Sequence, residues 1–294
     1  MLKIILLVSF LLSSIFCQSQ NTIMLKYAEN IKAIQSDFQK LSKINSDEEK
    51  NQINQNIRNS FDIILKDSER FSFEFDSLDF GGAVASQDGL VIIYTWNLSF
   101  EDGTFQYFGY LLHKSKKDAI ANVFPLESDR TQSIINGENE LKKKEWYGAI
   151  YYEIVGFKKD KQNCYILIGW DGNNMFTNKK IIESLTFSQN GKPEFGIKVF
   201  QVENKKMERL VFEYSKRATM TIMYDEKEKL IFYDHLAPSK PEYQNNFMYY
   251  GPDFSYDGFR LASDTWVLQS NIEIRNPNKD IDPKNRKINR YKKE

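Results

Sequence analysis

Hydrophobic residues near the N-terminus recur every three or four positions, as they do on one face of a helix. One apolar stripe runs through residues 21–41, and a second runs from Ile53 to Ile64. Between them, Ser46-Asp47-Glu48-Glu49 is a capping box, in which a hydroxyl and a carboxylate satisfy free amides at a helix start. The pattern predicts a helical hairpin over residues 20–68. We expect its apolar face to pack on a following sheet, and a partner-binding coiled coil is the alternative.

From Phe71 onward the period of the pattern changes to two, which is typical of strands. Short apolar segments continue to about residue 270, separated by polar turns such as Ser86-Gln87-Asp88-Gly89. Residues 90–96 carry large side chains on both faces, so this strand is expected to be central and covered on both sides. The other expected elements are strands at 104–113, 147–155 and 163–170, a short helix at 177–185, and a meander of strands at 196–202, 207–214, 218–224 and 229–235. Tyr256-Asp257-Gly258 is expected to start a final hairpin, in which 259–262 pairs with 265–269 or beyond.

The sequence therefore predicts an α+β protein, in which the helical hairpin precedes a mainly antiparallel β domain over residues 69–275. A sandwich, a curved sheet and a partial barrel or propeller all fit. Residues 114–145 are polar and rich in lysine, and we expect an internal boundary or a long insertion there. Residues 276–294 hold seven Lys/Arg and three Asp/Glu without an apolar period, which indicates a disordered tail. A role of this tail in binding nucleic acid or anionic lipid is a weaker alternative.

Residues 1–19 have the pattern of a secretory signal peptide. Lys3 precedes an apolar run, and Cys17 and Ser19 are small residues at the spacing that a signal peptidase requires, so we expect cleavage after Ser19. The run is shorter than the roughly 20 residues of a membrane span. Lipid attachment at Cys17 is disfavoured because the bulky Phe16 precedes it. We therefore expect a periplasmic, secreted or cell-surface protein without a transmembrane span.

Composition narrows the chemistry. The 40 Lys+Arg balance the 40 Asp+Glu, which argues against a nucleic-acid partner, and the 14% of aromatic residues favours a β-rich core. Once Cys17 has left with the signal peptide, Cys164 can form no internal disulfide, and its apolar strand predicts a buried, unreactive thiol. His113 and His235 are the only histidines, too few for a His-based zinc site, and no familiar catalytic motif is present. We expect His235 to be a hydrogen-bonded structural residue.

One segment fits a metal site. In Asp253-Phe254-Ser255-Tyr256-Asp257-Gly258, oxygen-bearing side chains alternate, glycine is sixth, and Asp264 stands at the twelfth position, as in a calcium loop. The segment departs from that pattern because Asp264 replaces glutamate, Leu261 occupies the ninth position, and no helices are expected on either side. Asp257-Gly258 fits a hairpin turn equally well. Calcium, held by Asp253, Ser255, Asp257 and Asp264, is the one cofactor that the sequence suggests.

Aromatic residues near strand ends are the candidate ligand-binding residues, together with one neighbouring carboxylate. They are Trp96, Trp146, Trp170, Asp171, Tyr256 and Trp266. The first hypothesis is an exported, non-catalytic binding or structural protein of the bacterial envelope, with an envelope protein or a glycan as partner. The alternative is a carbohydrate-active hydrolase, in which two carboxylates meet in an aromatic-lined cleft. The carboxylates available near strand ends are Glu153, Asp171, Asp234, Asp253 and Asp257.

Four stretches are distinctive as a set: 90–96 with Gly103-Thr104, 146–152, 168–173 and 250–259. In these stretches the chain resembles an uncharacterised family of secreted or periplasmic bacterial proteins, and the resemblance extends from about residue 85 to 275. It implies export and supplies no assigned activity. Asn97 stands where similar proteins tend to have Asp, so no carboxylate role is expected at that position.

Overall fold

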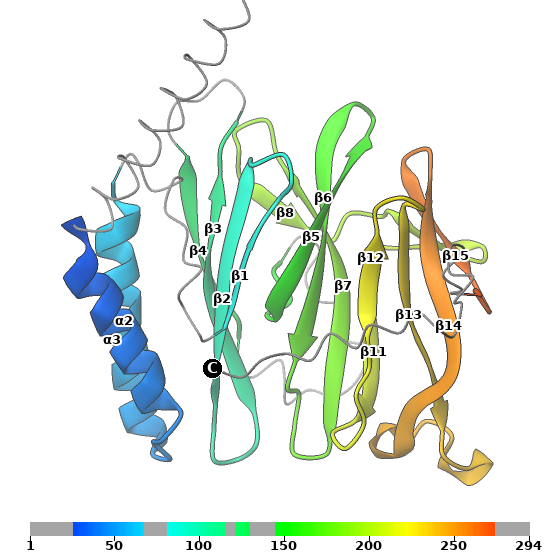
Figure 1. Cartoon of the computed structure of the whole chain (residues 1–294), viewed down its shortest axis with the longest axis horizontal. Coiled ribbons are helices and arrows are strands. Elements are labelled where there is room, and N and C mark those ends of the chain that lie inside the picture. The colour runs from blue at the N-terminus through cyan, green and yellow to red at the C-terminus, as the bar shows by residue number, and fades with distance from the viewer. Residues whose placement is uncertain (1–25, 68–80, 116–120, 130–144, 274–294) are drawn as a thin grey trace, which may run out of the picture.

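The computed structural model of this 294-residue chain describes residues 26–67, 81–115, 121–129 and 145–273. Two helices and three sheets form successive layers (Figure 1). The helices cover the first sheet, and the second sheet lies between the first and the third. This confirms the expected α+β class, a helical hairpin followed by a mostly antiparallel β region. The sheets are separate layers and do not close into a barrel. The expected signal peptide and the expected tail at 276–294 lie outside the described residues.

Helices α2 (Ala28–Leu41) and α3 (Asp47–Leu65) form the outer layer. The Ser46 hydroxyl accepts a hydrogen bond from the Glu49 amide at 3.4 Å, so the predicted cap does start α3. The apolar stripes of the two helices face the first sheet, as expected. Their buried members are Tyr27, Ile31, Ile34, Phe38, Ile53, Ile57, Phe61 and Ile64. Neither helix has the length and apolar character that a membrane crossing requires among the described residues.

The first sheet contains β1 (Gly82–Ala85), β2 (Val91–Ser99), β3 (Phe105–His113) and β4 (Asn122–Glu127), in that order. Strand β2 is covered on both faces, as its composition predicted: Tyr94 and Trp96 face the helices, and Ile93 faces the second sheet. Strand β4 lies within residues 114–145, which we expected to form a boundary or insertion. Residues 122–127 of that segment form the edge strand of the first sheet, and Leu126 packs into the core between the first two sheets.

The second sheet has the order β11-β7-β6-β5, with β8 paired to β7. Its strands are β5 (Ile150–Lys159), β6 (Gln162–Asp171), β7 (Thr177–Phe187), β8 (Pro193–Phe195) and β11 (Arg209–Ser215). The short helix expected at 177–185 is wrong, since this segment is the central strand β7. Ile181 faces the first sheet and Ile182 faces the third. Apolar residues on both faces of a buried strand can imitate the spacing of a helix.

The third sheet has the order β10-β9-β15-β14-β13-β12. Its strands are β9 (Phe200–Val202), β10 (Lys205–Met207), β12 (Ile222–Asp225), β13 (Leu230–Pro238), β14 (Tyr250–Ala262) and β15 (Thr265–Gln269). The expected meander is wrong, because β11 joins the second sheet while its sequence neighbours join the third. The expected final hairpin is confirmed, because residues 258–262 of β14 pair with residues 265–269 of β15. Tyr256-Asp257-Gly258 lies inside β14, so this strand begins before the expected start of the hairpin. The turn falls at Ser263-Asp264, where Ser263 has a φ of 58°.

Candidate functional site

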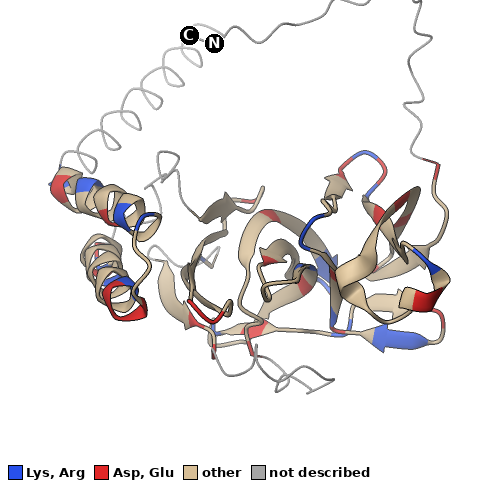
Figure 2. Cartoon of the chain, turned by 90° about the horizontal axis from the view of Figure 1, so that it is seen from below, with Lys and Arg blue, Asp and Glu red and all other residues tan. Residues whose placement is uncertain are grey.

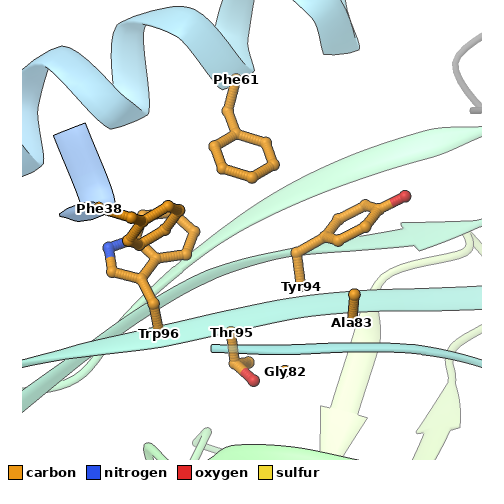
Figure 3. Close-up of a pocket in the computed structure, with 7 residues that line it drawn as sticks. All are labelled: Phe38, Phe61, Gly82, Ala83, Tyr94, Thr95 and Trp96. Atoms are coloured by element: carbon orange, nitrogen blue, oxygen red, sulfur yellow. The ribbon is translucent and has the colours of Figure 1, made fainter. Parts of the chain in front are cut away.

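Trp96 lies in the core between the helices and the first sheet. Its ring stacks on Phe61 with centroids 5.3 Å apart, and its indole N–H donates to the Asn54 side chain at 2.7 Å. Figure 3 shows the small cavity beside it, which is lined by Phe38, Tyr94 and their neighbours and measures about 10 Å³. This volume is enough for about one water molecule. In this structure Trp96 joins helices to sheet and faces no ligand-sized space.

The other tryptophans predicted as ligand-binding residues do not lie together on one surface. Trp266 is fully buried in the core between the second and third sheets, whereas Trp146 packs against the core between the first and second. Trp170 is half-buried, with its ring edge-on to Phe105 at 6.3 Å. Tyr256 is a half-buried residue of β14. The structure therefore distributes these residues over different layers.

Asp171, the predicted polar member of that set, is buried at the end of β6. Its carboxylate accepts hydrogen bonds from the hydroxyls of Tyr107 at 2.7 Å and Tyr147 at 3.1 Å, and from the Asn173 amide at 2.8 Å. Burial is the main cause that raises the pKa of both tyrosines, and the negative charge of Asp171 adds to it. Each hydroxyl therefore keeps its proton and donates it to the carboxylate.

A second buried carboxylate, Glu183 of β7, lies near Tyr147. The Tyr151 hydroxyl donates to one of its oxygens, and the Arg209 guanidinium from β11 binds the other. Burial raises the pKa of Glu183, while the adjacent Arg209 charge works against that rise. The Arg209 guanidinium also lies over the Tyr147 ring, 5.5 Å from its centroid.

We call Tyr107, Tyr147, Tyr151, Asp171, Glu183 and Arg209 the buried polar network. Strongly shifted pKa values often mark active sites. Here, however, Glu183 is fully buried and Asp171 nearly so, and tyrosine hydroxyls occupy the oxygens of both. A sugar substrate could reach neither carboxylate without separating the first two sheets. The network gives each buried carboxylate hydrogen-bond or ion-pair partners, without which its burial would destabilise the folded protein.

A groove of about 880 Å³ opens between the second and third sheets. It lies near the gold loop that joins β13 to β14 at the lower right of Figure 1. One wall comes from the loop before β7 and the segment after β11, and the other from the end of β13 and the start of β14. The lining residues are Met175, Phe176, Ser215, Lys216, Arg217, Ala218, Ala237, Pro238, Ser239, Met248, Tyr249, Tyr250, Gly251, Pro252 and Asp253.

The walls of this groove expose large apolar side chains. Met175 and Phe176 are each 60% exposed, and Met248 and Tyr249 are exposed as well. The loop that carries the first pair is well held, because the Asn174 side chain accepts hydrogen bonds from the amides of Phe176 and Thr177. These side chains are therefore presented to solvent by ordered backbone.

The two walls differ in charge. Lys216 and Arg217 are exposed on one wall, and Asp253 on the other pairs with His235 at 2.8 Å. The Ser255 hydroxyl, followed by other neighbours including His235, lowers the pKa of Asp253 to about 2. Figure 2 shows acidic and basic residues interspersed over the described chain. Charge recognition at the groove therefore depends on local groups and not on a surface of one sign.

Beside the groove, β14 contains a bulge of three residues, 253–255, which we call the Phe254 bulge. Asp234 pairs with Tyr256 and Leu236 with Pro252, so these three residues lie opposite His235 alone. Phe254 has a φ of 69° and is 93% exposed. A positive φ is rare for a bulky residue, and bulges are frequent beside functional sites. The Asp253 carboxylate fixes the bulge by accepting bonds from the Ser255 amide and hydroxyl.

The residues suggested for calcium have separate partners. Asp253 contacts Ser255 and His235, Asp257 accepts a hydrogen bond from the Asn271 amide, and Asp264 pairs with Lys159 at 3.6 Å. Among the described residues, no three His, Cys, Asp or Glu side chains gather in a metal-binding cluster. His235 is hydrogen-bonded, as expected. Cys164 is buried, and burial raises the pKa of its thiol.

Two other carboxylates considered for hydrolysis, Asp234 and Glu153, lie in different sheets, the third and the second. Asp234 accepts a hydrogen bond from the Thr221 amide at 2.7 Å, and burial raises the pKa of Glu153 in β5. The groove itself was not predicted from the sequence. Two features of the sequence could have indicated it: the apolar pair Met175-Phe176 within a polar loop, and the run Phe247-Met248-Tyr249-Tyr250. Only folding brings these two segments to one surface.

No family model, no curated protein and no solved structure matches this chain.

Proposed function

We propose that this chain is an exported, non-catalytic binding protein of the bacterial envelope, and that a partner polypeptide docks in the groove between the second and third sheets. One observation carries the proposal: the groove exposes Met175, Phe176, Met248 and Tyr249 together. Clusters of large apolar side chains at a protein surface are usually interaction sites, because leaving them in water costs free energy.

The chemistry of the groove favours a peptide segment with an apolar residue next to an acidic one. Methionine side chains are flexible and polarisable, so Met175 and Met248 can adapt to different apolar side chains. Lys216 and Arg217 offer positive charge to a neighbouring carboxylate. The volume of about 880 Å³ accommodates a few side chains of such a segment.

The surroundings of the carboxylates support binding over carbohydrate hydrolysis. Glycosidases place two carboxyl groups about 5–10 Å apart across the bond they cleave. Among the described residues that line the groove, Asp253 is the only carboxylate, and it is engaged by His235 and Ser255. Asp171 and Glu183 are enclosed in the buried polar network.

Export rests on the signal peptide expected over residues 1–19. Cleavage after Ser19 would leave a chain that begins at Gln20. N-terminal sequencing of the protein isolated from the cell envelope measures this start directly. Recovery of the uncleaved chain from the cytoplasm would contradict export and leave the groove proposal standing.

The binding proposal is tested with peptides displayed on phage and selected on the immobilised protein. We expect the selected peptides to carry an aromatic or aliphatic residue beside Asp or Glu, and synthetic copies to be measured by titration calorimetry. The double variant Phe176→Ser, Met248→Ser should weaken binding about tenfold or more, as loss of apolar anchors does. Both side chains are exposed, so folding should be unaffected.

The control is Val267→Ser, which removes an apolar side chain from β15 outside the groove, with an exposure of 36% against 38% for Met248. This variant should bind the peptides as the unchanged protein does. Equal weakening by Val267→Ser and by the groove variant would overturn the proposal. Cleavage of oligosaccharides by the purified protein would overturn its non-catalytic part.

A further inference from the structure

Phe254 is far more exposed than is usual for a large apolar residue. Its ring is 93% exposed, and its backbone is held at positive φ by three contacts of Asp253, two from Ser255 and one from His235. Backbone strain of this kind persists only where surrounding bonds maintain it. The bulge thus holds an exposed aromatic residue on a backbone that is fixed by its neighbours.

The Phe254 bulge also has the chemistry that the groove accepts. It places an aromatic ring, Phe254, directly after a carboxylate, Asp253. The groove offers apolar walls at Met175 and Phe176 and positive charge at Lys216 and Arg217. A bulge from one molecule therefore complements the groove of another in apolar character and charge.

The two features lie on the same face of the chain, because Asp253 belongs to the bulge and also lines the groove. A two-fold symmetric dimer requires such a self-complementary patch, in which each copy gives and receives the same contact. The near-complete exposure of Phe254 means that its ring does not fill the groove of its own chain.

We propose that this protein forms a two-fold symmetric dimer, in which Phe254 of each copy enters the groove of the other and Asp253 meets Arg217 across the interface. The proposal rests on the groove described under the proposed function, and it makes the second copy one occupant of that groove. Partner peptides then compete with dimerisation. An anionic membrane is a poorer partner, since Asp253 places a negative charge directly before the exposed Phe254.

Sedimentation equilibrium of the purified full chain tests the proposal. We expect a monomer–dimer equilibrium between about 1 and 200 μM, the range of modest interfaces. Phe254→Gly removes the ring and tolerates the positive φ, and it should raise the dimer dissociation constant at least about tenfold. Phe254→Tyr keeps the ring and should dimerise as the unchanged chain does. Val267→Ser serves as the control for an exposed apolar residue elsewhere.

A positive readout comes from disulfide trapping in a Cys17→Ser background, where the remaining Cys164 is buried. A chain with Phe254→Cys is mixed with a chain with Met175→Cys, and we expect a disulfide-linked pair under mild oxidation. The control mixture combines Phe254→Cys with Val267→Cys and should give far less.

A monomer at all concentrations, a dimer that Phe254→Gly leaves intact, or equal trapping in both mixtures would overturn the proposal. So would a monomer that binds anionic phosphatidylglycerol vesicles through Phe254. These failures remain distinct from failure of the proposed function, because selected peptides can bind the groove of a monomer and lose affinity in the Phe176→Ser, Met248→Ser variant.

Discussion

The buried polar network and the groove use similar residue types in opposite surroundings. In the network, Glu183 and Asp171 lie between sheets, and Arg209 and three tyrosine hydroxyls supply their bonds. At the groove, Arg217 and Asp253 face solvent beside exposed methionines and aromatic rings. Burial thus raises the pKa values of the three tyrosines in a region enclosed between sheets.

In this protein, a shifted pKa therefore does not by itself indicate an active site. A charge enclosed between sheets must be paired, because an unpaired one would cost several kcal/mol. Such pairing shifts pKa values whether or not catalysis follows. Exposed apolar surface is the better indicator of binding here, since it lowers stability and solubility unless a partner covers it.

Removal of Arg209 should have the largest effect on stability. In Arg209→Met, the buried Glu183 carboxylate loses its cation, and we expect the free energy of unfolding to fall by about 3–5 kcal/mol. Urea unfolding followed by circular dichroism measures it. The matched change at the groove, Arg217→Met, should stay within about 0.5 kcal/mol of the unchanged protein. Equal losses in the two variants would contradict the contrast between the regions.

Loss of a single hydroxyl should distinguish the regions on a smaller scale. In Tyr107→Phe, buried Asp171 loses one donor and the Gly172 amide loses its acceptor, which we expect to cost about 1–3 kcal/mol. Tyr249→Phe makes the same chemical change on the exposed groove wall and should be close to neutral. Urea unfolding compares the two. A neutral Tyr107→Phe would mean that Asp171 is satisfied without that hydroxyl.

The penalty of Arg209→Met should decrease in acid. The pKa of Glu183 is raised in the folded protein, so the stability linked to its protonated form is complete below the ordinary value of 4.5 and is lost as pH rises through the raised pKa. Without Arg209 the pKa rises further, and protonation removes the uncompensated charge. Unfolding at about pH 5 and about pH 8 should differ in penalty by about 1 kcal/mol or more. A constant penalty would exclude Glu183 as its source.

The smallest effect is expected at the Phe254 bulge. Asp253 has a pKa lowered to about 2 from 3.8, so its contribution is present above pH 3.8 and is lost as pH falls toward 2. Carbon-detected NMR of the carboxyl group follows this titration. Ser255→Ala should raise the midpoint toward 3.8 more than His235→Gln does, because the Ser255 hydroxyl is the largest cause. An unchanged midpoint in Ser255→Ala would contradict the hydrogen bonds that fix the bulge.

Local patterns predicted the helices well and some strands poorly. The stripe on α3 and the cap at Ser46 depend on neighbours within four positions, which the sequence displays directly. Strand β7 was mistaken for a helix because its apolar residues pack into two cores, one on each face of the strand. Strand β4 was missed because polar residues surround it in the sequence. The candidate site was predicted least well: Trp96 and Trp266 are core residues in the structure, and the groove was absent from the sequence interpretation.

The amino-acid sequence alone determined the class of this protein: a helical pair, antiparallel strands and a ring-rich interior. Periodicity and composition are local properties, and they depend on which face of an element is apolar. Only the tertiary structure decided that β11 crosses to the second sheet, that Glu183 meets Arg209, and that Met175 and Met248 share a groove. Those outcomes depend on which faces pack together across long stretches of chain, and no local pattern records that choice.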